Sequence, residues 1–190
     1  VIPCGDKDNI LLATRLGKAI RFDVHDVRVF VGRGSSGVRG IRLKPNDYVV
    51  SMSLIPNLEN RFILSVTENG FGKRTPIDDY RMTNRGGQGV ANIECSARNG
   101  PVVASYVASE DDQIMLVTNS GKLIRIRVHG GEGDSIRVAG RKTQGVRLFD
   151  VEEGEKVVSV ALLSENEDEQ DEENLEVVDE NKNEGKELDN

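Results

Sequence analysis

Short runs of alternating apolar and polar residues recur along most of the chain. They are rich in β-branched residues and are bounded by Gly, Asn, Asp or Ser, a pattern typical of β-strands. The runs cover residues 10–14, 19–22, 48–55, 62–67, 102–108, 114–118, 123–128 and 157–163. No stretch shows a sustained helical period, so the pattern predicts an all-β protein.

The clearest alternation lies in the seventh of these runs. Ile124, Ile126 and Val128 share one face of the expected strand, whereas Arg125 and Arg127 share the other. Because the apolar face packs inward, we expect the two guanidinium groups to point into solvent.

The chain also repeats itself about every fifty residues. Each copy contains a strand pair that turns at a glycine, with Lys and Arg just past the turn, in the sequences ATRLGKAIRF, TENGFGKRT and TNSGKLIRIR. The turn glycines Gly17, Gly70 and Gly121 are 53 and 51 residues apart. A fixed period of this size indicates a stacked or radial array of small β units.

A second signature of the repeat is an Arg/Gly loop that leads into another strand. It is centred on Gly37, Gly89 and Gly145, which are 52 and 56 residues apart. We therefore expect three units, residues 1–57, 58–108 and 109–164, called units 1, 2 and 3 below.

The last segment, residues 165–190, cannot join such an array. It contains thirteen Asp or Glu, two Lys and no aromatic residue. Such a segment buries too little apolar surface to offset its ordering entropy, which predicts a disordered acidic tail. Without this tail the net charge changes from −7 to +4. A basic body joined to an acidic tail suggests a polyanionic partner.

Positive charge is what the repeated turns and loops share. One hairpin with cationic ends needs no explanation beyond solubility, but three at equivalent positions favour a repeated partner. Duplex DNA is such a partner, with a phosphate charge about every 1.7 Å of its axis. Glycine in the loops would allow close backbone approach to phosphate, or serve only the β-turn itself. The predicted DNA-binding residues are Arg15, Lys18, Arg21, Arg33, Arg39, Arg42, Lys73, Arg74, Arg81, Arg85, Lys122, Arg125, Arg127, Arg141, Lys142 and Arg147.

Other chemistry has little support in the sequence. Residues 32–37 spell G-x-G-x-x-G, but no helix is expected to follow, which argues against a dinucleotide site. His129 with the nearby Glu132 and Asp134 is a weak metal set, so no metal site and no catalytic residue is predicted. Two cysteines, no signal peptide and no membrane span indicate a soluble cytoplasmic protein.

Together the repeated turns, the Arg/Gly loops and the acidic tail resemble the C-terminal domain of the bacterial DNA gyrase A protein, over essentially the whole chain. The family hallmark is the box Gln-Arg-Arg-Gly-Gly-Lys-Gly. Its nearest match here is the degenerate box formed by Arg85, Gly86, Gly87, Gln88 and Gly89. The resemblance places the principal box upstream of Val1 and matches this chain to the last three blades plus the tail.

The resemblance implies a β-pinwheel, in which four-stranded antiparallel blades exchange a strand with their neighbours and a positive outer rim wraps double-stranded DNA. It implies a heterotetramer that contains a gyrase B-type partner, together with an N-terminal part of the gyrase A protein that is missing here. That holoenzyme is an ATP-dependent type IIA topoisomerase. The B-type partner binds its ATP and Mg²⁺, and this chain is expected to bind no cofactor. The expected location is the cytoplasm, at the nucleoid and not at a membrane.

Three alternatives remain open from the sequence. A topoisomerase IV A-type C-terminal domain has related blades. A β-propeller that acts as a scaffold for proteins also repeats near fifty residues. An enzyme that uses the G-x-G-x-x-G loop would bind a nucleotide.

Overall fold

Eleven strands and two short 3-10 helices make up the chain in the computed structural model, which describes residues 1–32, 34–56, 61–130 and 135–164. The predicted acidic tail and Arg33 therefore lie outside the described residues. The all-β prediction is confirmed. The strands are β1 (Asn9–Thr14), β2 (Lys18–Asp23), β3 (Val49–Ile55), β4 (Phe62–Thr67), β5 (Phe71–Pro76), β6 (Val90–Ala91), β7 (Val102–Ala108), β8 (Gln113–Thr118), β9 (Leu123–Arg127), β10 (Val146–Arg147) and β11 (Val157–Leu163). The helices are η1 (Val24–Asp26) and η2 (Ile77–Asp79).

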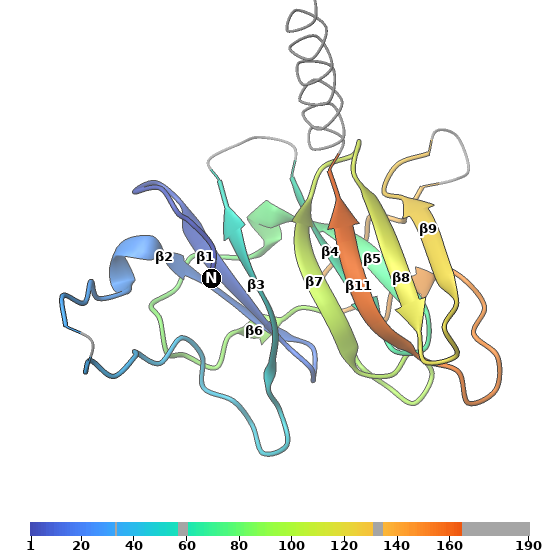
Figure 1. Ribbon diagram of the computed structural model, residues 1–190, viewed down its shortest axis with the longest axis horizontal. Coiled ribbons are helices and arrows are strands. Elements are labelled where there is room, and N and C mark those ends of the chain that lie inside the picture. The colour runs from blue at the N-terminus through green and yellow to red at the C-terminus, as the bar shows by residue number, and fades with distance from the viewer. Residues whose placement is uncertain (33, 57–60, 131–134, 165–190) are drawn as a thin grey trace, which may run out of the picture.

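The strands form three antiparallel sheets that follow one another along the molecule (Figure 1). Sheet 1 has the order β3-β1-β2-β6, and sheet 2 has the order β7-β4-β5-β10. Sheet 3 has the order β11-β8-β9, and no fourth strand is assigned to it within the described residues. No helix among these residues is long and apolar enough to cross a membrane.

Neighbouring units exchange a strand, as a pinwheel requires. β6 belongs to unit 2 by sequence, but it pairs with β2 of unit 1 through Lys18↔Ala91 and Ala19↔Val90. In the same way β10 of unit 3 pairs with β5 of unit 2. The donated strands β6 and β10 are only two residues long, and β5 is rich in polar residues. Hydrophobic alternation alone therefore did not reveal these three strands.

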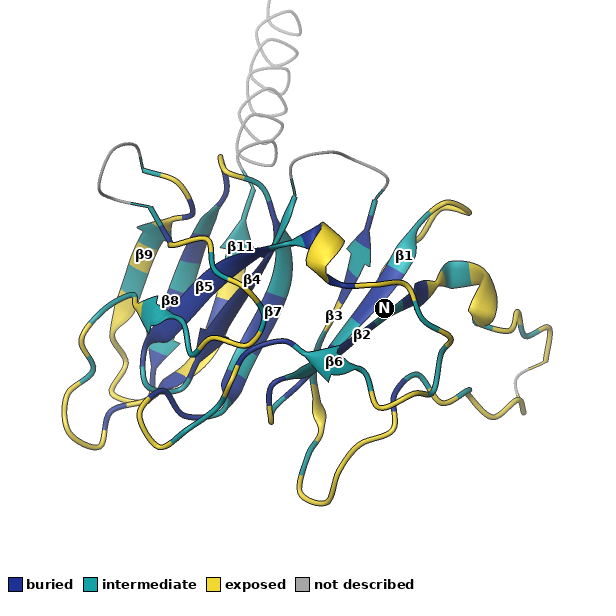
Figure 2. Ribbon diagram, turned by 180° about the vertical axis from the view of Figure 1, so that it is seen from behind, coloured by how far each residue is buried: buried dark blue, intermediate teal, exposed yellow. Residues whose placement is uncertain are grey.

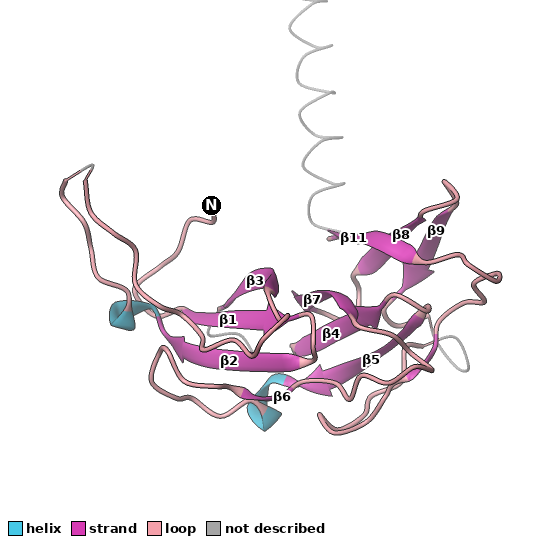
Figure 3. Ribbon diagram, turned by 90° about the horizontal axis from the view of Figure 1, so that it is seen from below, coloured by secondary structure: helices cyan, strands magenta, loops and turns pink. Residues whose placement is uncertain are grey.

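The sheets are arranged in an arc (Figure 3). β3, β7 and β11 contact one another in turn, so they form the inner side of the arc. β6, β10 and β9 are the last strands at the opposite end of each sheet and therefore form the outer edge.

Sheet 2 is buried on both faces because it lies between the other two sheets (Figure 2). On one face Leu64 packs in a cluster with Leu116 of sheet 3, and on the other Ile63 packs in a cluster with Leu11 of sheet 1. Full burial of such a side chain contributes about 1.5–3 kcal/mol, so the apolar contacts between sheets stabilise the arc.

A buried polar network also fixes the donated strand of unit 2. Asn92, which directly follows β6, donates to Ser65 Oγ at 3.1 Å and to Ser105 Oγ at 2.9 Å inside sheet 2. The Tyr80 hydroxyl donates to Asn92 Oδ1 at 2.5 Å, and burial raises the pKa of this phenol. Each of these buried polar groups has a hydrogen-bond partner within the network. The network therefore anchors the chain just beyond the exchanged strand.

The glycines of the Arg/Gly loops are required where the donated strand reaches its neighbour. Gly89 has φ of 70°, and a Cβ there would lie 2.4 Å from the Ala19 carbonyl oxygen. Gly145 has φ of 77°, and its Cβ would lie 2.6 Å from the Gly72 carbonyl oxygen. These contacts support the structural interpretation of the two glycines.

We expect Gly89→Ala to destabilise the protein by about 1–3 kcal/mol more than Gly154→Ala, because the added methyl group has no space. Gly154 is the matched control: its φ is 79°, so the backbone strain is similar, but a Cβ there would meet no atom within 4 Å. Urea denaturation of both variants measures the difference in the free energy of unfolding. Equal losses would contradict the close approach at Gly89.

Candidate nucleic-acid interface

The register of the three hairpins fixes which cationic residues are equivalent. The fourth residue after the turn glycine is an arginine in every unit: Arg21, Arg74 and Arg125. The positions are equivalent, but their surroundings differ, because units 1 and 2 are each followed by another unit within the described structure and unit 3 is not.

Lys73 does not follow the expected equivalence. Lys18 and Lys122 come directly after their turn glycines, but Lys73 is the third residue after its own. It takes the position of Ile20 and Ile124. The expectation of three equivalent turn lysines is therefore wrong, because unit 2 places Phe-Gly directly after the turn.

The Lys73 side chain is fully buried and binds the Arg/Gly loop of unit 3. Its ammonium donates to the carbonyl oxygens of Gly140 at 2.6 Å and Arg141 at 2.9 Å, and to Thr143 Oγ1 at 3.2 Å. Burial above all, together with the nearby charge of Arg141, lowers the pKa of Lys73 to about 8. Lys73 holds a loop in place and, in this structure, cannot reach a phosphate.

The arginines at this position in β2 and β5 also bind the following unit. Arg74 Nε donates to the Ile136 carbonyl at 2.6 Å, and its guanidinium pairs with Glu110 at 3.4 Å. Arg21 donates to the Ile77 and Tyr80 carbonyls at 3.4 and 3.3 Å, and burial lowers its pKa. Both were predicted as phosphate contacts, yet the structure uses their guanidinium groups between sheets.

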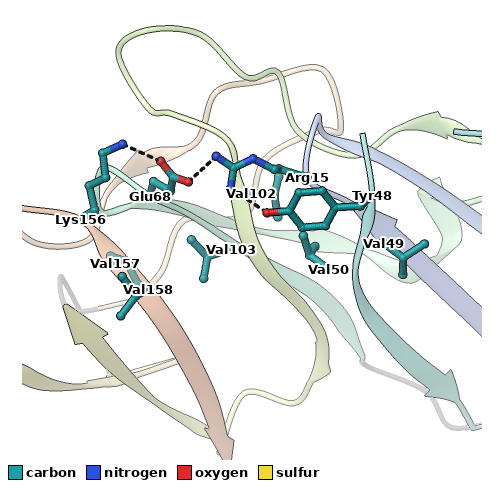
Figure 4. A pocket seen from close by; sticks show the side chains of 10 residues that line it. All are labelled: Arg15, Tyr48, Val49, Val50, Glu68, Val102, Val103, Lys156, Val157 and Val158. Carbon is teal, nitrogen blue, oxygen red and sulfur yellow. Dashed lines mark hydrogen bonds and ion pairs between the residues drawn. The ribbon is translucent and has the colours of Figure 1, made fainter. Parts of the chain in front are cut away.

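Arg15 takes part in an ion-pair bridge that joins all three units (Figure 4). The Glu68 carboxylate lies 2.7 Å from the Arg15 guanidinium and 3.2 Å from the Lys156 ammonium. The bridge lies beside a hollow of about 410 Å³ lined by valines of the three inner strands. It faces the inner side of the arc, away from the outer edge.

Lys122 is likewise held by carboxylates, at 2.8 Å from Glu152 and 3.1 Å from Glu155. Glu155 is buried, and hydrogen bonds lower its pKa to about 2, with the Ser120 hydroxyl as the largest cause. The hydrogen bond from Lys122 to Glu152 is the main cause that raises the pKa of the lysine.

The arginines of the later loops bind the preceding loop. Arg85 of the degenerate box donates to the Arg39 carbonyl at 2.8 Å and to the Asp26 carbonyl at 3.0 Å. Arg141, at the equivalent place in unit 3, donates to the Ala91 carbonyl at 3.0 Å. The box therefore connects loops here, while Arg147 pairs with Asp150.

A smaller set of predicted cations remains open to solvent. Arg125 and Arg127 point outward as expected, and Arg125 Nε donates to Gln113 Oε1 at 2.7 Å. Within the described residues no member of this set forms an ion pair. Its half-buried or exposed members are Lys18, Arg39, Arg42, Arg81, Arg125, Arg127 and Lys142.

Sequence reasoning missed one residue of this kind. Arg137 is exposed and occupies in unit 3 the place of Arg81 in unit 2, since Met82 and Val138 form matching bridges to the preceding unit. An alignment that began the third loop two residues earlier would have found it.

The loops that hold these cations run along β2 and β5. Thr83 N donates to the Arg21 carbonyl at 2.9 Å, and Ala139 N donates to the Arg74 carbonyl at 2.8 Å. Figure 3 shows these loops beside β2, β6 and β5, on the outer side of the arc. Arg81, Arg137 and Lys142 therefore lie along one edge that crosses from unit 2 to unit 3.

The described residues contain no group of three or more His, Cys, Asp or Glu that could hold a metal ion. The G-x-G-x-x-G segment also lacks the context of a nucleotide site. Residues 34–48 contain neither a helix nor a strand, so no helix N-terminus follows the glycines.

This architecture defines a strand-exchanged β-pinwheel with a cationic outer edge. The family model described as "DNA gyrase C-terminal domain, beta-propeller" matches residues 8–56, 61–100 and 112–164, and the chain belongs to this family. The DNA gyrase A protein of Rickettsia bellii is 37% identical over 90% of this chain and 24% of its own length. The chain thus spans about a quarter of the length of that relative.

Solved structures agree with the assignment. A DNA gyrase A C-terminal domain matches with a TM-score of 0.74 and 28% identity, over 85% of this chain and 52% of that one. The C-terminal domain of a DNA topoisomerase IV matches with a TM-score of 0.74 and 30% identity, over 83% of this chain and 47% of that one.

We expect Lys73→Met to destabilise the protein by about 1–3 kcal/mol near pH 7, because loop carbonyls lose their donor. The loss should grow as the pH rises from about 8 to 10.5. In this range the unfolded lysine still binds a proton that the folded one has released, so the stability of the wild type relative to the variant increases. Guanidinium denaturation at several pH values measures the difference, and a constant difference would contradict a lowered pKa at Lys73.

Proposed function

We propose that this chain binds duplex DNA along the outer edge of its arc, without sequence specificity. The observation that supports this most is the row of exposed cations at equivalent places in successive units, Arg81 and Arg137 above all. Phosphates recur along DNA without regard to base sequence, so a repeated cation suits the backbone and not the bases.

Because the outer edge is curved, DNA that binds along it is bent. DNA that follows an arc must bend, and a smooth bend of 40–90° over 20–30 base pairs costs roughly 1–6 kcal/mol. Several phosphate contacts along the path offset this cost through the release of counterions, which makes binding strongly dependent on salt. The buried Lys73 and Arg74 and the half-buried Arg21 act indirectly, because they hold the units and loops in the curved arrangement.

In the whole protein this domain serves a larger reaction. The relatives are named as gyrase A proteins, which supports a role in a type IIA topoisomerase that introduces negative supercoils. ATP and Mg²⁺ belong to a B-type partner, which with the N-terminal part of the gyrase A protein completes a heterotetramer in the cytoplasm, at the nucleoid. The wrapped segment is then presented to the catalytic part for strand passage.

A second candidate is the corresponding domain of topoisomerase IV, which the equal TM-score of that solved domain favours. The resemblance implies a less regular rim in topoisomerase IV, which would guide DNA along the arc less well, so the size of a measured change in DNA topology separates the two. A scaffold for proteins predicts binding that is insensitive to salt and leaves DNA topology unchanged.

We expect the double variant Arg81→Gln/Lys142→Gln to weaken DNA binding uniformly across sequences. Because two phosphate contacts are lost, the slope of log affinity against log salt should fall by about 1.8. Lys156→Gln is the matched control, since this lysine pairs with Glu68 on the inner side. Fluorescence anisotropy with two unrelated duplexes measures both; an unchanged slope in the double variant would contradict the proposed edge.

Wrapping itself is tested with a plasmid that is relaxed and resealed in the presence of the protein. We expect a shift in linking number that the double variant reduces and the Lys156→Gln control retains. Tight binding without any shift would limit the function to adhesion.

A further inference from the structure

The position directly after the turn glycine is cationic in units 1 and 3 but not in unit 2. Lys18 and Lys122 occupy it in units 1 and 3. Phe71 occupies it in unit 2 and is 3% exposed. Unit 2 has a neighbouring unit on each side, so the surroundings of Phe71 show what replaces the lysine there.

At the junction of units 2 and 3 the donated strand supplies the cation. Lys18 of β2 pairs with Ala91 of the donated β6. Phe71 of β5 pairs instead with Arg147 of the donated β10. The Arg147 guanidinium lies over the Phe71 ring, with Cζ 5.6 Å from the ring centroid. Each junction therefore has one cation at this residue pair, but the two cations come from opposite strands.

A second arginine covers the same ring. Arg98 lies in the loop before β7, and its Cζ is 4.9 Å from the Phe71 ring centroid. The backbone of this loop is fixed beside the turn. Asn69 Nδ2 donates to the Arg98 carbonyl at 3.1 Å, and Arg98 N donates to Ser96 Oγ at 3.2 Å. Two separate segments of the chain thus hold two guanidinium groups at one aromatic side chain.

Both guanidinium groups are available to an anion, because stacking on an aromatic ring leaves their N–H groups free to donate. Arg98 is exposed, and within the described residues no carboxylate pairs with it. Arg147 pairs with Asp150, but the two side chains are 60% and 80% exposed. An ion pair this exposed contributes little to stability, so a phosphate group can replace the carboxylate.

The other charged residues around the two arginines are already paired. The hollow beside the ring has a volume of about 300 Å³. Its two glutamates, Glu152 and Glu155, bind Lys122. Its lysine, Lys156, pairs with Glu68. The two arginines are therefore the available cations of this hollow.

We propose that Arg98 and Arg147, stacked on Phe71, bind a phosphate group of duplex DNA at the junction of units 2 and 3. This inference rests on the proposed function and adds to it a contact at the turn end of the hairpins. Lys18 makes the equivalent contact at the junction of units 1 and 2. The cation is retained at the same residue pair although the strand that carries it differs, which suits a ligand that presents the same charge at each junction.

The loop of unit 3 connects this site to the outer edge. It contacts β5 at Arg74 through Val138, next to the exposed Arg137. It contacts β5 again at Phe71 through Arg147, three residues earlier in that strand. At about 3.3 Å per residue, these two points are roughly 10 Å apart. This is within the width of a DNA major groove, about 12 Å, so one duplex reaches both Arg137 and Arg147.

Substitution of Arg98 tests the site directly. We expect Arg98→Gln to lower the slope of log affinity against log salt by about 0.9, because one phosphate contact is lost. Arg98→Lys keeps the charge and should keep the slope. Lys7→Gln is the control for the loss of one exposed charge, since Lys7 precedes β1 at the opposite end of sheet 1 from its turn. Fluorescence anisotropy measures all three, and an unchanged slope in Arg98→Gln would overturn the site.

Arg147 is tested by removal of its carboxylate partner. Asp150→Asn removes a negative charge beside the site, so we expect it to tighten DNA binding roughly two- to fivefold at low salt. Asp111→Asn is the matched control, because this exposed carboxylate precedes β8 at the opposite end of sheet 3 from its turn. It should change the affinity less. An equal gain in both variants would show an effect of net charge alone and would contradict a role for Arg147.

The equivalence of the two junctions is tested by moving the cation at the first one. Lys18→Phe should lower the salt slope by about 0.9. Lys18→Phe/Ala91→Arg reproduces the residue pair of the second junction and should restore the slope. Both positions are half-buried, so circular dichroism and thermal unfolding check that the variants fold. A folded double variant with the lowered slope would overturn the equivalence, whereas a wild type that does not bind DNA would contradict the proposed function itself.

Discussion

The hydrogen-bonding demand of a sheet edge is the constraint on which the rest of this structure depends. A strand at the edge of a sheet presents unpaired N–H and C=O groups, and here units 1 and 2 each take their fourth strand from the unit that follows. No unit is complete alone, so the units cannot separate without exposing an edge. The arc is therefore a consequence of strand exchange together with the apolar contacts on both faces of sheet 2.

This arrangement separates the cationic side chains into two groups with different roles. One group is inside the junctions: Lys73, Arg74 and Arg21 donate to carbonyl oxygens of the neighbouring unit. The other group lies on the outer loops, with Arg81 and Arg137 as its repeated members. The first group shapes the surface and the second is available to a polyanion. Both groups arise from the same repeat, because the loop that donates a strand to the preceding sheet also runs along β2 or β5 of that sheet.

In the strand that follows each turn glycine, small differences between copies determine whether a cationic side chain binds within the protein or remains exposed. Arg125 has the same position as Arg74 but is exposed, and no carbonyl group of another unit binds it within the described residues. Lys122 has the same position as Lys18, but two carboxylates bind it. Equivalent positions in the repeat thus share the same place in the backbone, whereas the neighbouring unit determines what each side chain contacts.

The sequence by itself determined the all-β class, the fifty-residue period and the outward face of Arg125 and Arg127, because periodicity along a strand is a local property. The expected exchange of strands came from a family resemblance and not from hydrophobic alternation, since β6 and β10 are only two residues long. Only the tertiary structure decided that Lys73 is buried and that Arg85 connects loops. Those outcomes depend on which carbonyl groups another unit brings within reach, and no spacing along the chain contains that information.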